Sequence, residues 1–167
     1  MSRVERIFIA SDAGEPMVEL SEANVIAGQG LAGDRYVSKT GTYSWGEGNG
    51  RQLTIMEAEV IHEINDGIGI PFLAEECRRN IVSRGLVLNP LVGMRIRIGR
   101  DALIDVTRLC HPCNYLQSLL GRPVLKPLTN KGGIRCDVFA GGVIRTGDAI
   151  EVVGPIDPPI PGVGQKA

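Results

Sequence analysis

Two cysteines and a histidine stand close together in the stretch TRLCHPCNYL, at Cys110, His111 and Cys113. Thiolate sulfur and imidazole nitrogen can bind a metal, exchange disulfides or attack an electrophile. Cys113 follows Pro112, and the next residues, NYLQSLLG (114–121), predict a short helix. A helix start places unpaired N–H groups and a partial positive charge near the sulfur, which favours the thiolate. Cys113 is therefore the strongest candidate for a reactive sulfur.

Three kinds of chemistry fit this pair of thiols. A structural zinc site needs four ligands, normally in two pairs, but Cys77 and Cys136 stand alone in separate strand-like segments, where a buried core position suits them better. A thioredoxin-like dithiol uses Cys-x-x-Cys at a helix start, yet that motif belongs in a βαβ sheet, which these surroundings do not resemble. The third is a single thiolate that binds molybdenum or carries sulfane sulfur. The residue types alone leave all three open.

Several arginines stand beside glycines or in expected loops, where a guanidinium group can bind a phosphate or a carboxylate. Arg78 and Arg79 are adjacent in the segment CRRN. A strand would direct their side chains to opposite faces, so that one enters a pocket and its neighbour stays in water. Arg35 and Arg135 are further candidates for binding an anion. For any single arginine, an ordinary solvated charge remains the simpler interpretation.

The chain as a whole has 167 residues and a formal net charge of −1. This length predicts one domain, residues 1–167, with a core of its own. The balanced charge predicts no nucleic acid and no anionic membrane as partners. The N-terminal apolar run is too short for a signal peptide or a membrane span, so we expect a cytoplasmic protein with reduced thiols.

Most of the elements that position these residues should be short strands, because 22 glycines and 10 prolines imply many turns. The glycine-rich segment 28–50 lacks apolar periodicity and predicts a long surface loop. Residues 155–167, rich in proline and glycine, predict an extended tail. Strand-like segments recur at residues 4–10, 17–20, 78–85, 94–99, 102–109, 134–140 and 149–154. The pattern predicts a mainly β, barrel-like domain with a few short helices.

One of these helices is expected after the segment RQLTIME (51–57). Thr54 and Glu57 have the spacing of a capping box, which would open the helix. Its buried face would carry the apolar residues at helical spacing, and Gly67 would end it. That face consists of Val60, Ile61 and Ile64.

Six segments occur in a fixed order between residues 28 and 153: GLAGDRY (30–36), RQLTIME (51–57), ECRRNIVSRG (76–85), LVGMRIRIG (91–99), LCHPCNYL (109–116) and GGIRCDVFAGGVIRTGDAIEV (132–152). Together they resemble the MOSC domain, a family named after the C-terminal domain of molybdenum cofactor sulfurase. The most specific part is the dipeptide PC followed by GG and an I-R-x-G-D segment. The chain is similar to the small stand-alone bacterial type.

The resemblance implies a β-rich MOSC barrel and a role in molybdenum cofactor or sulfur chemistry. The family's key cysteine, which ligates molybdenum in the reductase branch and is proposed to handle sulfur in the sulfurase branch, falls on Cys113. Cys110 would be a second thiol that assists it. Arg78, Arg79 and Asn80 match the segment beside the family's site, and the Gly30–Arg35 segment matches another wall.

The expected ligand is therefore the molybdenum cofactor, a molybdopterin, with Cys113 as the metal ligand. Its anionic part would be held by a set of polar residues: Arg35, Arg78, Arg79, Asn80 and Arg135. Pyridoxal phosphate is not expected, because it belongs to a sulfurase module that the matching segments do not include. The expected partners are a cofactor or sulfur donor protein and, for an enzyme, an electron-donor protein.

Several functions remain compatible with this resemblance. The chain could be a molybdenum-dependent reductase of N-hydroxylated compounds, a sulfur transferase, a non-catalytic carrier of the cofactor, or a Cys-x-x-Cys redox protein. The reductases have a different sequence after their cysteine than the residues Asn114, Tyr115 and Leu116 found here. Their activity therefore does not transfer directly.

Overall fold

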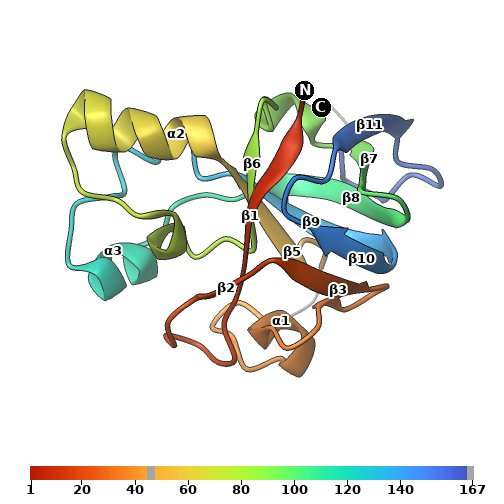
Figure 1. Ribbon diagram of the computed structural model, residues 1–167, viewed down its shortest axis with the longest axis horizontal. Helices are drawn as coiled ribbons and strands as arrows, with labels where there is room; N and C mark the ends of the chain where they lie inside the picture. Colours follow the sequence, from red (N-terminus) through yellow and green to blue (C-terminus); the bar gives the residue numbers. More distant parts are fainter. Residues whose placement is uncertain (45–47, 165–167) are drawn as a thin grey trace.

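A computed structural model describes residues 1–44 and 48–164 of the chain (Figure 1). The glycine-rich segment 28–50 and the tail 155–167 each extend outside these ranges. A large sheet has the strand order β11-β7-β8-β9-β5-β6-β1-β2. Its strands, in chain order, are β1 (Arg3–Ile9), β2 (Val18–Leu20), β5 (Leu53–Glu57), β6 (Ile81–Arg84), β7 (Met94–Ile98), β8 (Ala102–Leu109), β9 (Ile134–Ala140) and β11 (Ile150–Pro155).

A second, smaller sheet has the order β10-β3-β4, formed by β10 (Gly142–Arg145), β3 (Glu22–Ile26) and β4 (Gly30–Leu31). Within the described residues the strand pairs of both sheets are antiparallel, except for the parallel pair of β5 and β6. The large sheet curls until β1 meets the start of β11, where the Val4 N–H donates to the Asp148 carbonyl at 2.8 Å and the Ile150 N–H to the Ser2 carbonyl at 3.0 Å. The prediction of a mainly β, barrel-like domain is confirmed.

Short helices cover one side of the sheet, where α2 and α3 lie together in Figure 1. Helix α2 (Ala58–His62) continues into a π-helical turn, η1 (Glu63–Ile68), and α3 spans Asn114–Leu120. The remaining helical turns are α1 (Arg35–Ser38), η2 (Ala74–Cys77) and η3 (Asn89–Leu91). The short helix predicted directly after Cys113 is confirmed.

The core has two parts, one on each face of the central strands. Inside the curled sheet lie residues such as Ile55, Ile81 and Ile104. Between the sheet and the helices lie Met56, Val82 and others, including Leu116 of α3. Strands β5 and β6 are thus buried on both faces, as is usual where helices cover a sheet. This packing fixes α3, and with it Cys113, against the outer face of the sheet.

The start predicted for the helix after RQLTIME (51–57) is wrong. Thr54 belongs to strand β5, where its side chain bonds to Asn80, so it cannot cap a helix. Helix α2 begins at Ala58, and the Glu57 carboxylate accepts the N–H of Leu88 at 2.7 Å instead. The segment LTIME does not alternate between polar and apolar residues, because both faces of β5 are buried. Its pattern therefore could not distinguish a strand from the start of the helix.

The end of that helix also lies further along the chain than predicted. The turn η1 runs past Gly67 to Ile68, and Gly69 ends it in a left-handed conformation with φ of 73°. The predicted buried face of Val60, Ile61 and Ile64 is confirmed.

The geometry predicted for the paired arginines is wrong as well. Arg78 is not in a strand, because it ends η2 with a left-handed backbone, φ 57°. Arg79 and Asn80 connect it to β6. The two arginine side chains nevertheless differ in environment, since Arg79 is buried and Arg78 is only partly so.

The glycine-rich segment and the tail are more ordered than predicted in the parts that are described. The former contains β4 and α1. The latter continues from β11, and Ile156 is buried and donates its N–H to the Gly93 carbonyl at 3.0 Å. Strands β3 and β10 were not predicted, because short segments such as GVIR carry too few apolar residues for a clear alternation.

Candidate functional site

Cys113 sits at the N-terminal cap of α3, as the sequence predicted, with an extended backbone (φ −135°, ψ 161°). Its carbonyl accepts the N–H of Gln117 at 3.2 Å, and its side chain makes no capping bond. Cys113 instead lines a half-open pocket, together with Tyr43, His111 and Tyr115.

A tyrosine holds the sulfur from the side. The hydroxyl of Tyr43 donates a hydrogen bond to Cys113 Sγ at 3.0 Å. Burial, and then the bond to Cys113, raise the pKa of Tyr43 to about 12, so the hydroxyl keeps its proton at neutral pH. Tyr115 packs edge-on against the Tyr43 ring, with centroids 6.1 Å apart. The arrangement supplies a fixed proton donor to a thiolate at this position.

Four of the five residues predicted to hold an anion line the same pocket, and they come from three separate parts of the chain. They are Arg35, Arg78, Arg79 and Arg135. No carboxylate stands among the described residues that line it. Burial lowers the pKa of Arg78, and repulsion from the positive charge of Arg35 lowers it further. An anion bound here would relieve this repulsion.

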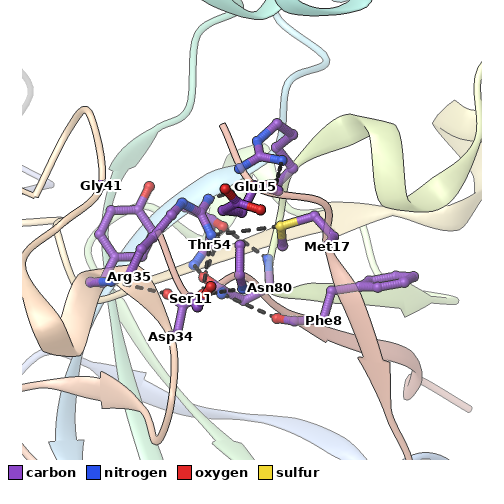
Figure 2. A network of polar contacts seen from close by, with 12 residues as sticks. Phe8, Ser11, Glu15, Met17, Asp34, Arg35, Gly41, Thr54 and Asn80 are labelled. Carbon is purple, nitrogen blue, oxygen red and sulfur yellow. Dashed lines mark hydrogen bonds and ion pairs between the residues drawn. The ribbon is translucent and has the colours of Figure 1, made fainter. Parts of the chain in front are cut away.

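Arg35 is fixed by a buried network, seen from close by in Figure 2. Asp34 caps α1 and accepts three bonds: from the Ala10 N–H at 3.0 Å, from the Tyr36 N–H at 3.2 Å and from Arg35 Nη1 at 3.1 Å. Arg35 Nη2 also donates to the carbonyl of Arg78 at 3.1 Å. The guanidinium group therefore reaches the pocket wall in one defined orientation.

Arg79 is held by backbone carbonyls. Its Nε donates to Gly132 and its Nη1 to Cys77, each at 2.9 Å. Gly132 packs so tightly that an added Cβ would stand 2.1 Å from the carbonyl oxygen of Cys110, which explains why glycine is needed there. Arg78 Nη1 donates to the carbonyl of Glu15 at 2.6 Å at the pocket's edge.

Asn80, the fifth predicted anion ligand, does not line the pocket. It is fully buried, and its Oδ1 accepts the backbone N–H of Thr54 at 3.1 Å. Its Nδ2 donates to the carbonyl of Phe8 at 3.3 Å. Figure 2 shows this amide between the two strands β5 and β1. Asn80 directly precedes β6 and links the two strands that flank it, β5 and β1, so its side chain points into the sheet and away from the arginines' pocket.

The other three cysteines lie away from the pocket, and all four thiols are free. Cys110, predicted to assist Cys113, directly follows β8 and is only 2% exposed. Burial raises the pKa of Cys77, and raises that of Cys136 further. In the described part of the chain, no group of three or more His, Cys, Asp and Glu side chains could hold a metal.

The pattern of the whole domain identifies its family. A family model of the MOSC domain matches residues 42–151, which is more than half of the chain and includes Tyr43, Cys110, Cys113 and Arg135. The chain belongs to the MOSC domain family. This family is associated with the molybdenum cofactor and with functions like those of its sulfurase. No curated protein sequence matches the chain significantly.

Solved structures of similar MOSC-type proteins share the fold. The YuaD protein from Bacillus subtilis matches with a TM-score of 0.73 and 24% identity, over 91% of this chain and 96% of that one. YiiM from Geobacillus stearothermophilus matches with a TM-score of 0.69 and 19% identity, over 92% and 75%. YiiM from Escherichia coli matches with a TM-score of 0.63 and 22% identity, over 92% and 71%.

Reasoning from the sequence missed several residues of the MOSC pocket. Tyr43 donates a hydrogen bond to Cys113, and Tyr36 accepts one from Arg135. Both tyrosines lie in the glycine-rich segment, which has no periodic pattern of apolar residues. His111 lines the pocket beside Cys113, as its place in the motif suggested. An isolated tyrosine in a long glycine-rich loop is a usable signal, because such loops often carry functional residues.

Within the described residues no helix is long and apolar enough to cross a membrane.

Proposed function

We propose that this MOSC protein binds the molybdenum cofactor, with Cys113 Sγ as the protein ligand of the metal. The observation that carries the proposal is the position of this sulfur. Cys113 is the one thiol of the four that faces the pocket with four arginines in its lining. The family's association with this cofactor supports the same assignment.

The residues present suit the group. A thiolate is a soft ligand and matches molybdenum better than the carboxylates, which are missing from the described lining. Guanidinium groups match the phosphate of a molybdopterin, to which arginine can donate two parallel hydrogen bonds. When bound, the molybdenum would supply two-electron redox chemistry.

Each residue of the pocket would have a distinct task. Arg78 and Arg79 would bind the anionic end of the cofactor, since both side chains reach the pocket from the turn before β6. Arg35 would fix the turn itself through its bond to the Arg78 carbonyl. Tyr43 would hold the sulfur through its hydroxyl proton and stabilise its negative charge before the metal is bound.

A sulfane sulfur on Cys113 is the second candidate, because the same partly exposed thiol could carry a persulfide. The electrostatics of the pocket favour the larger anionic ligand. A persulfide needs stabilisation at one atom, whereas four arginines from three segments of the chain line the pocket.

The test is the molybdenum content of the full chain purified from a molybdenum-replete host. We expect close to one molybdenum per chain for the wild type and a loss to background for Cys113→Ser, since an alcohol is a harder and normally protonated ligand. Cys110→Ser is the matched control. It removes a thiol three residues earlier in the chain that does not line the pocket, so most of the metal should remain.

Other outcomes would point elsewhere. Intact-mass analysis that finds a sulfur atom added at Cys113, without molybdenum, would favour the persulfide carrier. If Cys110→Ser loses the metal while Cys113→Ser retains it, the proposed ligand is wrong. A requirement for both cysteines in a turnover assay with a disulfide would favour the dithiol redox protein.

A further inference from the structure

A second hollow opens onto Cys113 from another side. Its described lining is Tyr43, Arg51, Arg108, Leu109, His111, Cys113 and Arg135. We call it the Arg108 lobe. It shares four residues with the pocket described above: Tyr43, His111, Cys113 and Arg135. Cys113 thus lies where the two spaces meet.

Three guanidinium groups come together in this lobe. Burial lowers the pKa of Arg108, and the positive charges of Arg135 and Arg51 lower it further. The fold thus holds three like charges close together in spite of their mutual repulsion. Arg51 donates to the Tyr43 carbonyl at 2.9 Å, while its Nε is buried without a hydrogen-bond partner among the described residues. Arg135 contributes its charge to both spaces.

The carboxylates of the described residues leave this charge largely uncompensated. Asp137 is the acidic group that acts on Arg108, but its Oδ1 accepts the N–H of Gly50 at 2.9 Å, and burial raises its pKa. Within residues 1–44 and 48–164, none of Arg51, Arg108 and Arg135 forms an ion pair. Like charges held together in a hollow are typical of a site for an anion.

The packing keeps these arginines in place. Gly50 has φ of 73°, and an added Cβ would stand 2.9 Å from Arg108 Nε and 3.0 Å from Arg135 Cβ. A glycine is thus required for the backbone to approach both side chains. Arg108 itself is exposed at the end of β8, so its guanidinium group is available to a ligand that enters from solvent.

We infer that the Arg108 lobe is the substrate side of the site and binds an organic anion by its carboxylate or phosphate group, next to Cys113. This inference deepens the proposed function, since it leaves the other pocket to the cofactor. The anion would lie between Arg51 and Arg108, and the rest of the substrate would contact Leu109 and the Tyr43 ring. Guanidinium groups bind both oxyanions by the same paired hydrogen bonds.

The alkylation of Cys113 provides a test that does not require the metal. The full chain, purified from a molybdate-free culture, is treated with iodoacetate, an anion, and with iodoacetamide, its neutral analogue. In both reactions the thiolate displaces iodide. The rate constant for iodoacetate divided by that for iodoacetamide is therefore independent of the fraction of thiolate, and it reports how strongly the site attracts the anion. Peptide mass spectrometry measures each rate at Cys113.

We expect Arg108→Gln to lower this ratio by about three- to tenfold, the size expected for one charge near a protein surface. Arg51→Gln should act in the same direction. Arg97→Gln is the matched control, because it also removes one positive charge but lies on β7 in a pair with Glu151, outside both spaces. An unchanged ratio in Arg108→Gln, or an equal fall in Arg97→Gln, would overturn the inference.

Two further measurements separate this inference from the proposed function. Arg108→Gln from a molybdenum-replete host should keep the wild-type molybdenum content, and a loss of metal would assign this lobe to the cofactor instead. Acetate and inorganic phosphate, compared at equal ionic strength, should each slow alkylation by iodoacetate in the wild type more than in Arg108→Gln, and the stronger of the two identifies the preferred group. Equal protection in both proteins would contradict an anion site. If the wild type binds no molybdenum, the proposed function fails while the alkylation ratio still stands.

Discussion

Removing the carboxylate of Asp34 should destabilise the whole domain, because this group is fully buried and holds three donors. Two of these donors are the backbone N–H groups of Ala10 and Tyr36, and the third is the charged side chain of Arg35. In Asp34→Ala all three lose their partner at once, and the positive charge of Arg35 is left beside a cavity.

The magnitude follows from the kinds of contact. Removing one partner of a buried ion pair costs about 3–5 kcal/mol, because the remaining charge stays buried without compensation. An unsatisfied buried N–H adds about 1 kcal/mol or more, although such terms are not fully additive. We therefore expect Asp34→Ala to lose about 4 kcal/mol of unfolding free energy. Asp34→Asn keeps an oxygen acceptor and should lose roughly half as much.

Urea denaturation followed by circular dichroism is the assay. With a slope of about 2 kcal/mol per M, the midpoint of Asp34→Ala should fall by about 2 M. Asp12→Ala is the matched control, since Asp12 is exposed and makes no side-chain hydrogen bond or ion pair among the described residues. A change in Asp34→Ala of less than about 1 kcal/mol at an unchanged slope would refute the reasoning, because a buried ion pair could not then be holding α1 and Arg35.

Three further predictions concern the thiols and one surface pair. Brief treatment with iodoacetamide near neutral pH should label Cys113 at least about tenfold faster than the three buried cysteines, as peptide mapping would reveal; equal labelling would contradict it. Tyr43→Phe should slow this labelling about two- to fivefold by removing the hydrogen bond to the thiolate, whereas Tyr115→Phe should not. The hydrogen bond from Arg84 lowers the pKa of Glu5, and burial raises it by less, so the pKa is lowered overall. The pair therefore stabilises the fold above about pH 4.5 and loses this effect as the pH falls through the lowered pKa, so the deficit of Glu5→Gln in urea melts should shrink toward acid pH; a deficit that grows there would refute it.

Strands β8 and β9 could be predicted from the sequence, whereas β5, which lies beneath the helices, could not. In β8 and β9 the expected ranges 102–109 and 134–140 coincide with the observed strands. Strand β5 was missed because both of its faces are buried, so its apolar residues form a run without alternation. Whether such a run becomes strand or helix depends on its neighbours in the sheet.

The features of the site also differ in whether the sequence could predict them. Local sequence was enough to place Cys113 at the start of a helix and Cys110 just after a strand, because caps and strand ends are set by neighbouring residues. It also singled out the arginines as a class. It could not tell that Asn80 faces the sheet and Arg79 the pocket, since that depends on the turn at Arg78 with its positive φ.

The amino-acid sequence by itself determined the family and the mainly β character, and it singled out Cys113 as the candidate reactive thiol, because these signals lie in short motifs and in the frequent turn residues. Only the tertiary structure decided which groups meet at that cysteine. Tyr43 and Cys113 are 70 positions apart, and Arg108 of β8 meets Arg51 from the segment before β5. These contacts arise from the curl of the sheet and the close approach at Gly50. Pairings between distant segments depend on the packing of the entire chain, which no local pattern encodes.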